Sequence, residues 1–459
     1  MMKTQFILVA VITVTLISIH GCTDEETNYQ IRVTGLEQDC SQIPVHCAIR
    51  LPERFSSIPE EEIAVNLGNK ETGTTGIPGQ IIKDDQGRPE LWWIIPHLKT
   101  NSSSTWQATL SRKKGAVTEK FTWEDKPGKY LDLLFNDRKV SRFIYGYDTT
   151  SEQRFFETYK PFHHIFDEKG EYMITEGPNG DEPYNQKAIL YPHHRGLFIG
   201  WPLTCDGESY SYWGMNKTNK HMCAITQGFS EHTAGPVLAR SNALISWNDT
   251  DGTPIIVEER KTTVYRSEDQ SLVLLDFESQ LKSVKGEIRL NGNADHGGVH
   301  YRPHNDVAVV NQSWRYFRLI KEEDRETSED VEKRGGATEA AYIFHADSVA
   351  PVLKEPVDER RLMTLAKFPD LPWTAMSYGL KGTEYTVQHM NHPGNPGPTE
   401  YSAYRGYGRF GAWFQTAIPK GETLKVKYRI WISTGEIPAR DEMARKYVAF
   451  KSTPEAEVL

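Results

Sequence analysis

Short strand-like segments, separated by clusters of turn-forming residues, fill almost the whole chain after residue 27 and restrict its fold more than any other feature. β-branched, aromatic and aliphatic residues make up segments such as "EIAVNLG", "LWWIIPHL", "SLVLLDFESQL" and "TLKVKYRIWI". Gly, Asn, Asp and Pro gather between the segments, as in "NKETGTTGIPG" and "HPGNPGP". Only residues 438–450 place a proline near a first turn and apolar residues at helical spacing. The sequence therefore predicts an all-β protein with one C-terminal helix.

The 459 residues exceed what one compact domain usually holds. The segment 123–129, "WEDKPGK", is the predicted boundary. A small immunoglobulin-like β domain, a β-sandwich, is expected at residues 27–125, and a large antiparallel β-sandwich at residues 130–450. The charged stretch 321–336 is predicted to be a solvated loop or a lid insertion.

The amino terminus has the features of an export signal. Lys3 precedes an apolar run at 6–19 that is too short for an ordinary membrane span, and a small residue precedes Cys22. This pattern resembles a bacterial lipoprotein signal at residues 1–22, with Cys22 as the lipidated residue; a plain secretory signal is the alternative. We expect an extracytoplasmic protein, anchored by lipid in the periplasm or at the outer-membrane surface and touching the membrane only through that anchor.

Charge and cysteine content narrow the partners and the compartment. Sixty-two acidic against 53 basic residues give a net charge of −9, which does not suit a nucleic-acid binder. Four cysteines follow Cys22, and an even number outside the cytoplasm predicts disulfides, paired by proximity as Cys40–Cys47 and Cys205–Cys223. Because no C-x-x-C pair occurs, a thiolate zinc site is not expected.

The segment 191–201, "YPHHRGLFIGW", places two histidines and an arginine directly before an apolar run. In a regular strand, His193 and Arg195 would share one face and His194 the other. Only one of the two histidines could then face a site, and the other would be structural. A cap at the start of a buried strand is the alternative role for either histidine.

A second polar segment is "NADHGGVHYRPHND" at 293–306. Strand alternation would place His296, His300, Arg302 and His304 on one face, about 7 Å apart, which suits an extended ligand. A solvent-facing polar strand is the alternative. The loop-rich segment 387–411 adds His389, His392, Tyr401, Arg405, Tyr407 and Arg409.

Histidine-rich segments favour proton transfer near neutral pH. Neutral histidine is also a metal ligand, so a divalent metal stays an alternative, although no H-E-x-x-H spacing occurs. No cofactor is required, since the chain has no phosphate loop, no G-x-S-x-G elbow and no G-x-G-x-x-G after a strand. The carboxylates in 255–281 (Glu258, Glu259, Asp276 and Glu278) lie in segments that read as ordinary strands.

The same segments resemble a known family, the DUF6807 or "methane oxygenase PmoA"-like proteins, over about residues 130–450. The resemblance rests on the motifs "KPFHHIF", "PHHRGLFIGW", Tyr212–Trp213, "EERKTTVY", Gly297–Gly298, "NHPGNP" and "YRGYGRFG". It carries over to His164, His193, His194, Arg195, His392, Pro393, Asn395 and Tyr407. Two positions depart from the family pattern, Asn391 in place of Asp and Tyr191 in place of His, which puts any role at those positions in doubt.

The resemblance implies an extracytoplasmic carbohydrate-associated β-sandwich protein, with a large domain similar to the supersandwich of mutarotase-like and lyase enzymes. A methane oxygenase subunit does not fit, because it needs several membrane-spanning helices and the sequence has no further apolar stretch of that length.

Together the segments and the resemblance favour a lyase or dehydratase that acts on uronic-acid oligosaccharides in the degradation of a polysaccharide, with algal polysaccharides as one candidate source. The expected acid and base groups are His164, His193, His194, His296 and Tyr407. The expected substrate-binding groups are Arg195, Trp213, His300, Arg302, His389, His392 and Arg405. The alternatives are a hydrolase or lyase of 3-keto-glycosides, a mutarotase-like epimerase, and a surface glycan-binding lipoprotein without catalysis; the sugar, the linkage and the oligomeric state stay open.

Overall fold

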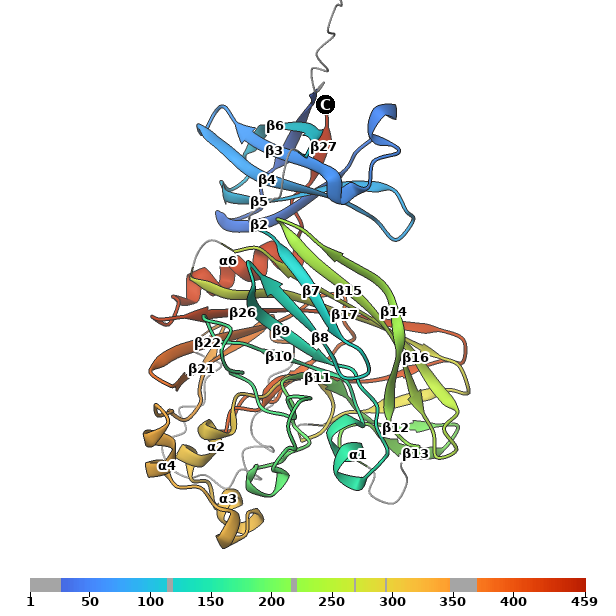
Figure 1. Cartoon of the computed structure of the whole chain (residues 1–459), viewed down its shortest axis with the longest axis vertical. Helices are drawn as coiled ribbons and strands as arrows, with labels where there is room; N and C mark the ends of the chain where they lie inside the picture. Colours follow the sequence, from blue (N-terminus) through green and yellow to red (C-terminus); the bar gives the residue numbers. More distant parts are fainter. Residues whose placement is uncertain (1–25, 114–118, 216–220, 268–269, 294, 347–369) are drawn as a thin grey trace, which may run out of the picture.

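The computed structural model describes residues 26–113, 119–215, 221–267, 270–293, 295–346 and 370–459. Strands dominate, and they form two stacked domains of unequal size (Figure 1). The predicted all-β class with a C-terminal helix is confirmed. Cys22 and the predicted signal lie outside the described residues.

The small domain is one curled sheet around its own apolar core. Its strand order is β2 (Cys40–Ala48), β5 (Pro89–Leu98), β4 (Thr74–Lys83), β3 (Ile63–Asn69), β6 (Ser103–Arg112), β1 (Thr27–Thr34) and β27 (Ala456–Val458), with short 3₁₀ turns at Glu53–Phe55 and Glu60–Glu62. β6 pairs with both β1 and β3, so all the strands of this domain belong to one continuous sheet. The predicted immunoglobulin-like domain would have two separate sheets instead. The last strand of the chain returns to this domain and pairs with β1.

The long-strand sheet forms one layer of the large domain. Its order is β14 (Ala224–Ala234), β15 (Leu238–Asn248), β16 (Pro254–Tyr265), β17 (Ser271–Ser283), β26 (Thr423–Thr434), β22 (Thr383–Asn391), β21 (Trp373–Leu380) and β20 (Ala341–Phe344). Leu275 and Phe277 of β17 face the core between the layers, whereas Leu274 packs on the opposite face toward the small domain. Burial on both faces explains why this strand reads as a nearly continuous apolar run.

The short-strand sheet forms the facing layer. Its order is β23 (Glu400–Tyr401), β24 (Phe410–Trp413), β19 (Gly298–Tyr301), β11 (Leu197–Gly200), β10 (Phe162–Ile165), β9 (Arg138–Ile144), β8 (Tyr130–Phe135) and β7 (Phe121–Lys126). β7 pairs with β8 and therefore belongs to the large domain. The boundary consequently falls between β6 and β7, a few residues before the predicted 123–129 segment.

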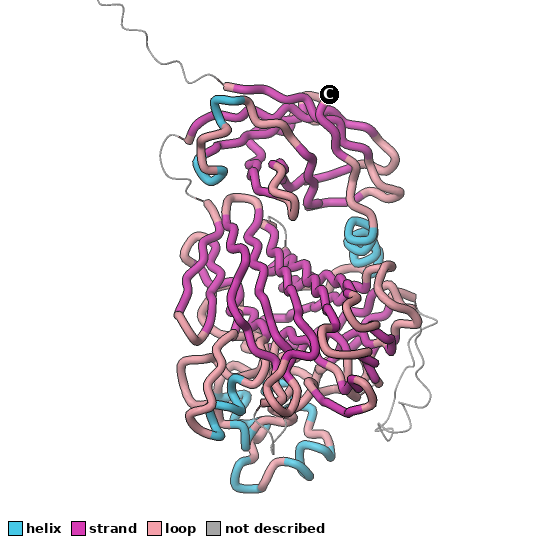
Figure 2. The backbone as a smooth tube through the Cα atoms, turned by 90° about the vertical axis from the view of Figure 1, so that its right-hand side faces the viewer, coloured by secondary structure: helices cyan, strands magenta, loops and turns pink. Residues whose placement is uncertain are grey.

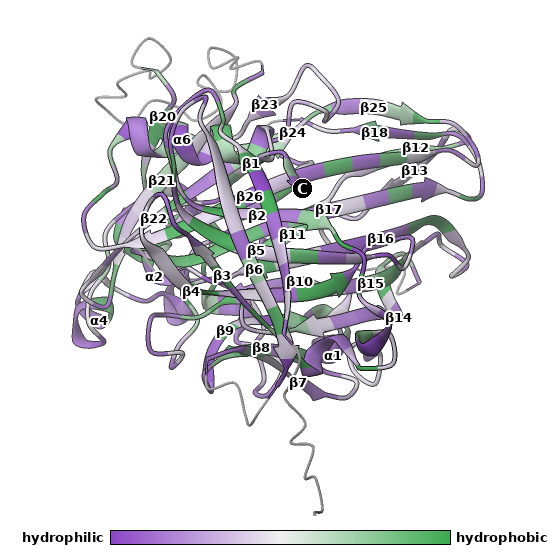
Figure 3. Cartoon of the chain, turned by 90° about the horizontal axis from the view of Figure 1, so that it is seen from above, coloured by the Kyte–Doolittle hydropathy of each residue, from purple (hydrophilic) through white to green (hydrophobic). Residues whose placement is uncertain are grey.

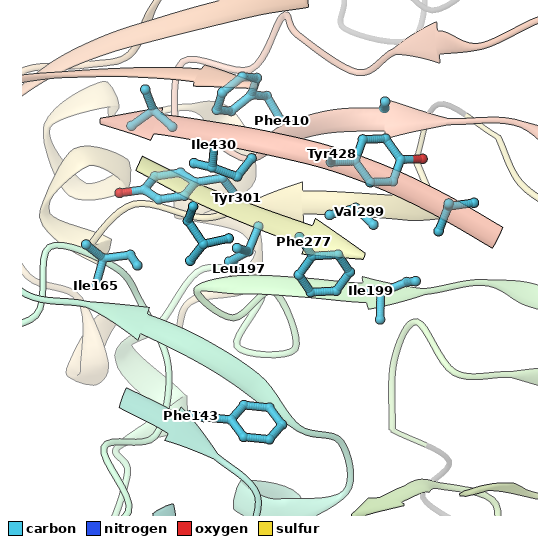
Figure 4. Close-up of a cluster of buried hydrophobic side chains, with 14 of the residues drawn as sticks. Phe143, Ile165, Leu197, Ile199, Phe277, Val299, Tyr301, Phe410, Tyr428 and Ile430 are labelled. Carbon is cyan, nitrogen blue, oxygen red and sulfur yellow. The ribbon is translucent and has the colours of Figure 1, made fainter. Parts of the chain in front are cut away.

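The two layers enclose the main hydrophobic core. Figure 4 shows side chains of the short strands, such as Leu197 and Tyr301, gathered with Phe277 and Ile430 of the long strands. A separate four-stranded sheet, β13 (Glu208–Ser211), β12 (Pro202–Cys205), β18 (Ile288–Asn291) and β25 (Gln415–Ile418), extends the sandwich. In β18 hydrophobic and hydrophilic residues alternate, as strands with one buried face require (Figure 3).

Short helices lie at the far end of the large domain from the small one, and the C-terminal helix lies between the domains (Figures 1 and 2). The short helices are α1 (Glu152–Thr158), α2 (Asn305–Asn311), α3 (Trp314–Leu319) and α4 (Ser328–Lys333), with 3₁₀ turns at Gln186–Ala188 and Glu322–Asp324. The predicted lid segment 321–336 thus contains helix α4. The predicted C-terminal helix is α6 (Arg440–Lys451), whose Met443 and Phe450 pack with Trp92 of the small domain.

The two predicted disulfides are wrong, because all four cysteines are free and buried. Cys40 and Cys47 are the two ends of a stretch of β2, and seven strand residues span about 23 Å, whereas a disulfide needs its Cα atoms within about 7 Å. Cys205 packs in the main core, while Cys223 packs with Phe155 and Tyr159. Sequence proximity failed here because an extended strand separates near neighbours.

Because the four cysteines form no disulfide, we expect the stability of the folded protein to be insensitive to reductant. Burial raises the pKa of Cys40 and Cys223 to about 11 and that of Cys47 to about 12, which leaves them protonated and inert at neutral pH. We expect the melting temperature to be unchanged by dithiothreitol. Peptide mapping after alkylation in denaturant without reductant should find all four residues alkylated; any pair found only after reduction would contradict the free-thiol assignment.

Candidate active site

The candidate site lies on the outer face of the short-strand sheet. Residues of β11 and β19 alternate between the two faces, so Leu197 and Val299 enter the core while Phe198 and His300 face outward as register partners. Connecting segments rather than solvent cover this outer face, and His300 is fully buried. Strand alternation therefore correctly placed His300 away from the apolar core.

Trp213 is the centre of the side chains that meet there. Its ring centroid lies 4.9 Å from His300, 5.6 Å from His194 and 6.0 Å from His296. Two cations approach the same ring, the Arg409 guanidinium carbon at 5.3 Å and the Lys160 Nζ at 5.8 Å. We call this group the Trp213 cluster; it consists of Lys160, His193, His194, Trp213, His296, His300 and Arg409.

The two adjacent histidines both belong to the cluster, because the chain is not a strand at that point. Tyr191 has φ +54° and Gly196 has φ +43°, and the strand begins only at Leu197. A side chain at Gly196 would meet the His163 carbonyl oxygen at 2.0 Å, so glycine is required for the turn. The rings of His193 and His194 consequently contact each other, with centroids 4.2 Å apart, and the predicted division between two faces does not apply.

His300 and Arg409 form a defined pair. His300 Nε2 donates to the Gly297 carbonyl oxygen at 2.8 Å, which leaves Nδ1 as an acceptor for Arg409 Nη1 at 3.3 Å. Burial, and then the Arg409 charge, hold the pKa of His300 well below its ordinary value. His300 is therefore a neutral residue that positions the guanidinium.

Both cations are buried without a counter-ion. Arg409 is 1 % exposed, and among the described residues no carboxylate lies within ion-pair distance of it. Lys160 is 3 % exposed; its Nζ donates to the Trp213 carbonyl oxygen at 2.6 Å and lies 4.2 Å from the Phe198 ring centroid. Burying a cation without a counter-ion costs on the order of several kcal/mol, so an anionic ligand that bound Arg409 would offset part of that cost.

Three buried nitrogen atoms of the cluster have no hydrogen-bond partner among the described residues. They are His194 Nδ1, Trp213 Nε1 and Arg409 Nε. The side chains of His194 and Arg409 both contact the indole ring of Trp213. A buried polar atom without a partner costs about 1–3 kcal/mol. Their convergence favours a polar ligand that would supply the missing partners.

The cations also set the protonation of the histidines. Burial, followed by the Lys160 charge, holds the pKa of His193 well below its ordinary value. Burial, followed by His193 and Arg409, does the same to the pKa of His194. Both rings are therefore neutral at pH 7 and able to accept a proton.

Arg405, Tyr407 and the acidic Asp295 border the cluster. Arg405 Nη2 donates to Asp295 Oδ1 at 2.6 Å, so this guanidinium already has its anion. The Tyr407 ring lies 5.5 Å from that of Tyr191 and 6.4 Å from that of His194. Tyr407 also hydrogen-bonds Arg409, which links the phenol to the unpaired cation.

Two arginines that were predicted to bind substrate donate hydrogen bonds to backbone carbonyl oxygens instead. Arg195 donates to the carbonyl oxygens of Phe156 and Glu157 in α1 and of Pro192. Arg302 donates to the carbonyl oxygens of Tyr407 and Leu190. Both side chains are fully buried, and they fix the segments that carry the cluster rather than joining it.

Three predicted histidines lie elsewhere. His164 Nε2 donates to the Pro178 carbonyl oxygen at 3.0 Å and Nδ1 accepts from Thr175 Oγ1 at 2.9 Å, so both ring nitrogens are used. His389 lies in the core, where it contacts Tyr401 and the Val299 carbonyl oxygen. His392 lies in the 392–398 loop against Phe450 of α6.

Sequence reasoning named Arg409 in the segment 387–411 without giving it a role, and it did not name Lys160. Lys160 and Arg409 both lie inside the motifs that carry the family resemblance, "KPFHHIF" and "YRGYGRFG". The motifs are a signal that could have found them. Their contact with the Trp213 ring, which Arg195 and Arg302 lack, is a property of the folded chain alone.

Within the described residues, no group of three or more His, Cys, Asp and Glu side chains is arranged to hold a metal ion. In the same part of the chain, no helix combines the length and apolarity that a membrane span needs.

Buried neutral histidines predict a loss of stability at acidic pH. Burial lowers the pKa of His163, His164 and His389 to about 3, below the value of about 6.5 in an unfolded chain. Between these values the unfolded state binds more protons, so the free energy of unfolding falls as pH decreases from about 6.5 toward 3. Each histidine contributes a slope of about 1.4 kcal/mol per pH unit.

Urea denaturation of the wild type and of His164→Gln between pH 4 and 6 checks this. The free energy of unfolding of the variant should change with pH less steeply than that of the wild type, by about 1.4 kcal/mol per pH unit, whatever its stability at pH 7. Equal slopes for both proteins would show that His164 titrates in the same way folded and unfolded.

The fold and the site together define an all-β sandwich with a buried, cationic, histidine-rich centre on one outer sheet face. The chain belongs to DUF6807, a family of unknown function, whose model matches residues 130–448. That range contains every residue of the Trp213 cluster. A comparison with curated proteins found no match.

Proposed function

We propose that the Trp213 cluster is the active centre of a carbohydrate-active lyase or dehydratase that acts on uronic-acid oligosaccharides. The observation that carries the proposal is Arg409, a buried guanidinium without a carboxylate partner among the described residues. An anionic substrate group would complete it, and a planar carboxylate fits a guanidinium in a bidentate manner. A neutral sugar would leave the cation unpaired.

Elimination from a uronate needs three tasks, and the cluster has a group for each. Arg409 neutralises the carboxylate, which makes the C5 proton acidic. His193, neutral and partly exposed, removes that proton, and the electron pair forms the C4–C5 double bond as the C4–O bond breaks. Tyr407 gives its phenolic proton to the leaving oxygen, while Trp213 Nε1 and His194 Nδ1 bind substrate oxygens.

Product analysis tests the proposal. Purified protein is incubated with uronate and neutral oligosaccharides, and products are followed by mass spectrometry and by the ultraviolet absorbance of an unsaturated uronate. Cleavage without water uptake, or loss of water, from uronates alone supports the proposal. Uptake of water contradicts it, and tight binding with unchanged masses would identify a glycan-binding protein instead.

Lys160 favours a second candidate, a hydrolase or lyase of 3-keto-glycosides. Burial, followed by the charges of Arg195 and Arg260, holds the pKa of this amine well below its ordinary value, so it loses its proton more readily than an ordinary lysine, and its neutral form is nucleophilic toward ketones. The nitrogen would add to C3, and the carbonyl oxygen would leave as water to give an imine. Borohydride treatment with a keto-glycoside would then fix the sugar on the Lys160 peptide but not in Lys160→Arg; an unlabelled wild-type peptide removes this candidate.

A further inference from the structure

A cavity separate from the Trp213 cluster opens beside β9 and the start of α2. Its volume is about 610 Å³, within the range of about 300–1,000 Å³ of ligand sites. Side chains of β9, of the 166–189 segment and of the start of α2 line it, and Arg334 and Lys381 close it from later parts of the chain. None of its lining residues belongs to the Trp213 cluster.

The strong charges of this cavity are already paired within the protein. Arg142 binds Asp132 with two nitrogens and also Asp181. Arg334 donates to Asp306 at 2.6 Å. Glu176, 5 % exposed, accepts from the Tyr184 hydroxyl at 2.9 Å and from backbone amides. Each carboxylate oxygen can accept more than one hydrogen bond, so lone pairs remain for a ligand.

Three nitrogen atoms that line the cavity have no hydrogen-bond acceptor or carboxylate partner among the described residues. Lys139 Nζ and Lys381 Nζ make no ion pair; Lys381 Nζ lies 4.0 Å from the Tyr172 ring centroid and Lys139 Nζ 5.7 Å from that of Phe166. His304 uses Nδ1 toward Asp306, at 3.4 Å from Oδ1, which leaves Nε2 free on a side chain that is 32 % exposed. Hydrogen-bond donors and acceptors thus both line the cavity.

The charge balance selects the ligand. An anion would meet the carboxylates of Glu176 and Asp306, and a cation would meet the two free lysines. A hydroxyl group both donates and accepts, so it matches both kinds of partner, and Phe166 and Tyr172 provide apolar wall for the faces of a sugar ring. The contrast with the Trp213 cluster, whose charges are cationic, is marked.

From this geometry we propose that the cavity between β9, the 166–189 segment and α2 is a second carbohydrate site, which binds an uncharged sugar. The lysines and His304 donate to its hydroxyl groups, and Glu176 and Asp306 accept from them. The proposal is independent of the reaction assigned to the Trp213 cluster.

Calorimetric titration with neutral trisaccharides of glucose, mannose, galactose and xylose tests the site. We expect at least one to bind the wild type, and Lys381→Ala and Lys139→Ala to weaken that binding about 5- to 30-fold. His304→Asn should weaken it too, while the asparagine still caps α2. Lys420→Ala, in an exposed turn far along the chain, is the matched control and should bind normally.

Melting temperatures of all variants verify folding, and Arg409→Met separates the two sites. Neutral-sugar binding that survives Arg409→Met but weakens in the lysine variants supports the proposal. No binding of any neutral trisaccharide overturns it, as does binding lost in Arg409→Met or unchanged in Lys381→Ala and Lys139→Ala.

Discussion

Arg409→Met should abolish most turnover of a uronate substrate without destabilising the protein. Loss of a preorganised charged donor lowers kcat/KM by about 10²–10³-fold. The free energy of unfolding should stay the same or rise, because methionine removes a buried cation that has no carboxylate partner among the described residues. Steady-state kinetics and urea denaturation of the same preparations measure both effects.

The controls separate charge from geometry. Arg409→Lys keeps the charge but loses the planar bidentate fork, so it should recover only part of the activity. Arg289→Met, at an exposed position paired with Glu287, should match the wild type in both measurements. A strongly destabilised but catalytically normal Arg409→Met would show that this arginine is structural.

Glu258→Gln should have the largest effect on stability. Glu258 Oε1 accepts from Arg260 Nε at 2.8 Å and from Ser279 Oγ at 2.9 Å, and Oε2 accepts from Trp247 Nε1 at 2.8 Å. Removing its charge leaves Arg260, 2 % exposed, as an uncompensated buried cation. The expected loss is about 3–5 kcal/mol in the free energy of unfolding.

A double variant tests the cause of that loss. Glu258→Leu together with Arg260→Met removes both charges and should recover much of the stability, since buried ion pairs are often replaceable by apolar groups. Urea denaturation of the single and double variants gives the comparison. A double variant as unstable as Glu258→Gln would attribute the loss to packing and to the Trp247 hydrogen bond instead of to charge. The sequence-based view of Glu258 as part of an ordinary strand agrees with its position in β16.

Local patterns were sufficient for the fold class. Alternation, turn clusters and the helical spacing at 438–450 depend on neighbours in sequence, and these predicted the strands and α6. Pairing between distant segments left no such trace. The return of β27 to the small domain and the free state of Cys40 and Cys47 therefore could not be read from spacing.

The candidate site was predicted in part. His193, His194, Trp213, His296 and His300 meet in one cluster, from three segments of the chain. Arg195 and Arg302 were predicted to bind substrate, but their guanidinium groups bind backbone carbonyls. The residue type was the same in each case, and only the surroundings differed.

The sequence by itself determined the all-β architecture, the family motifs and the histidine-rich segments, because side-chain alternation and composition are local properties. The tertiary structure alone decided which charges are compensated. Arg405 received a carboxylate from Asp295, 110 residues earlier in the chain, whereas Lys160 and Arg409 were buried against aromatic rings. Electrostatic pairing depends on distances of a few ångströms between segments far apart in the chain, and folding sets those distances.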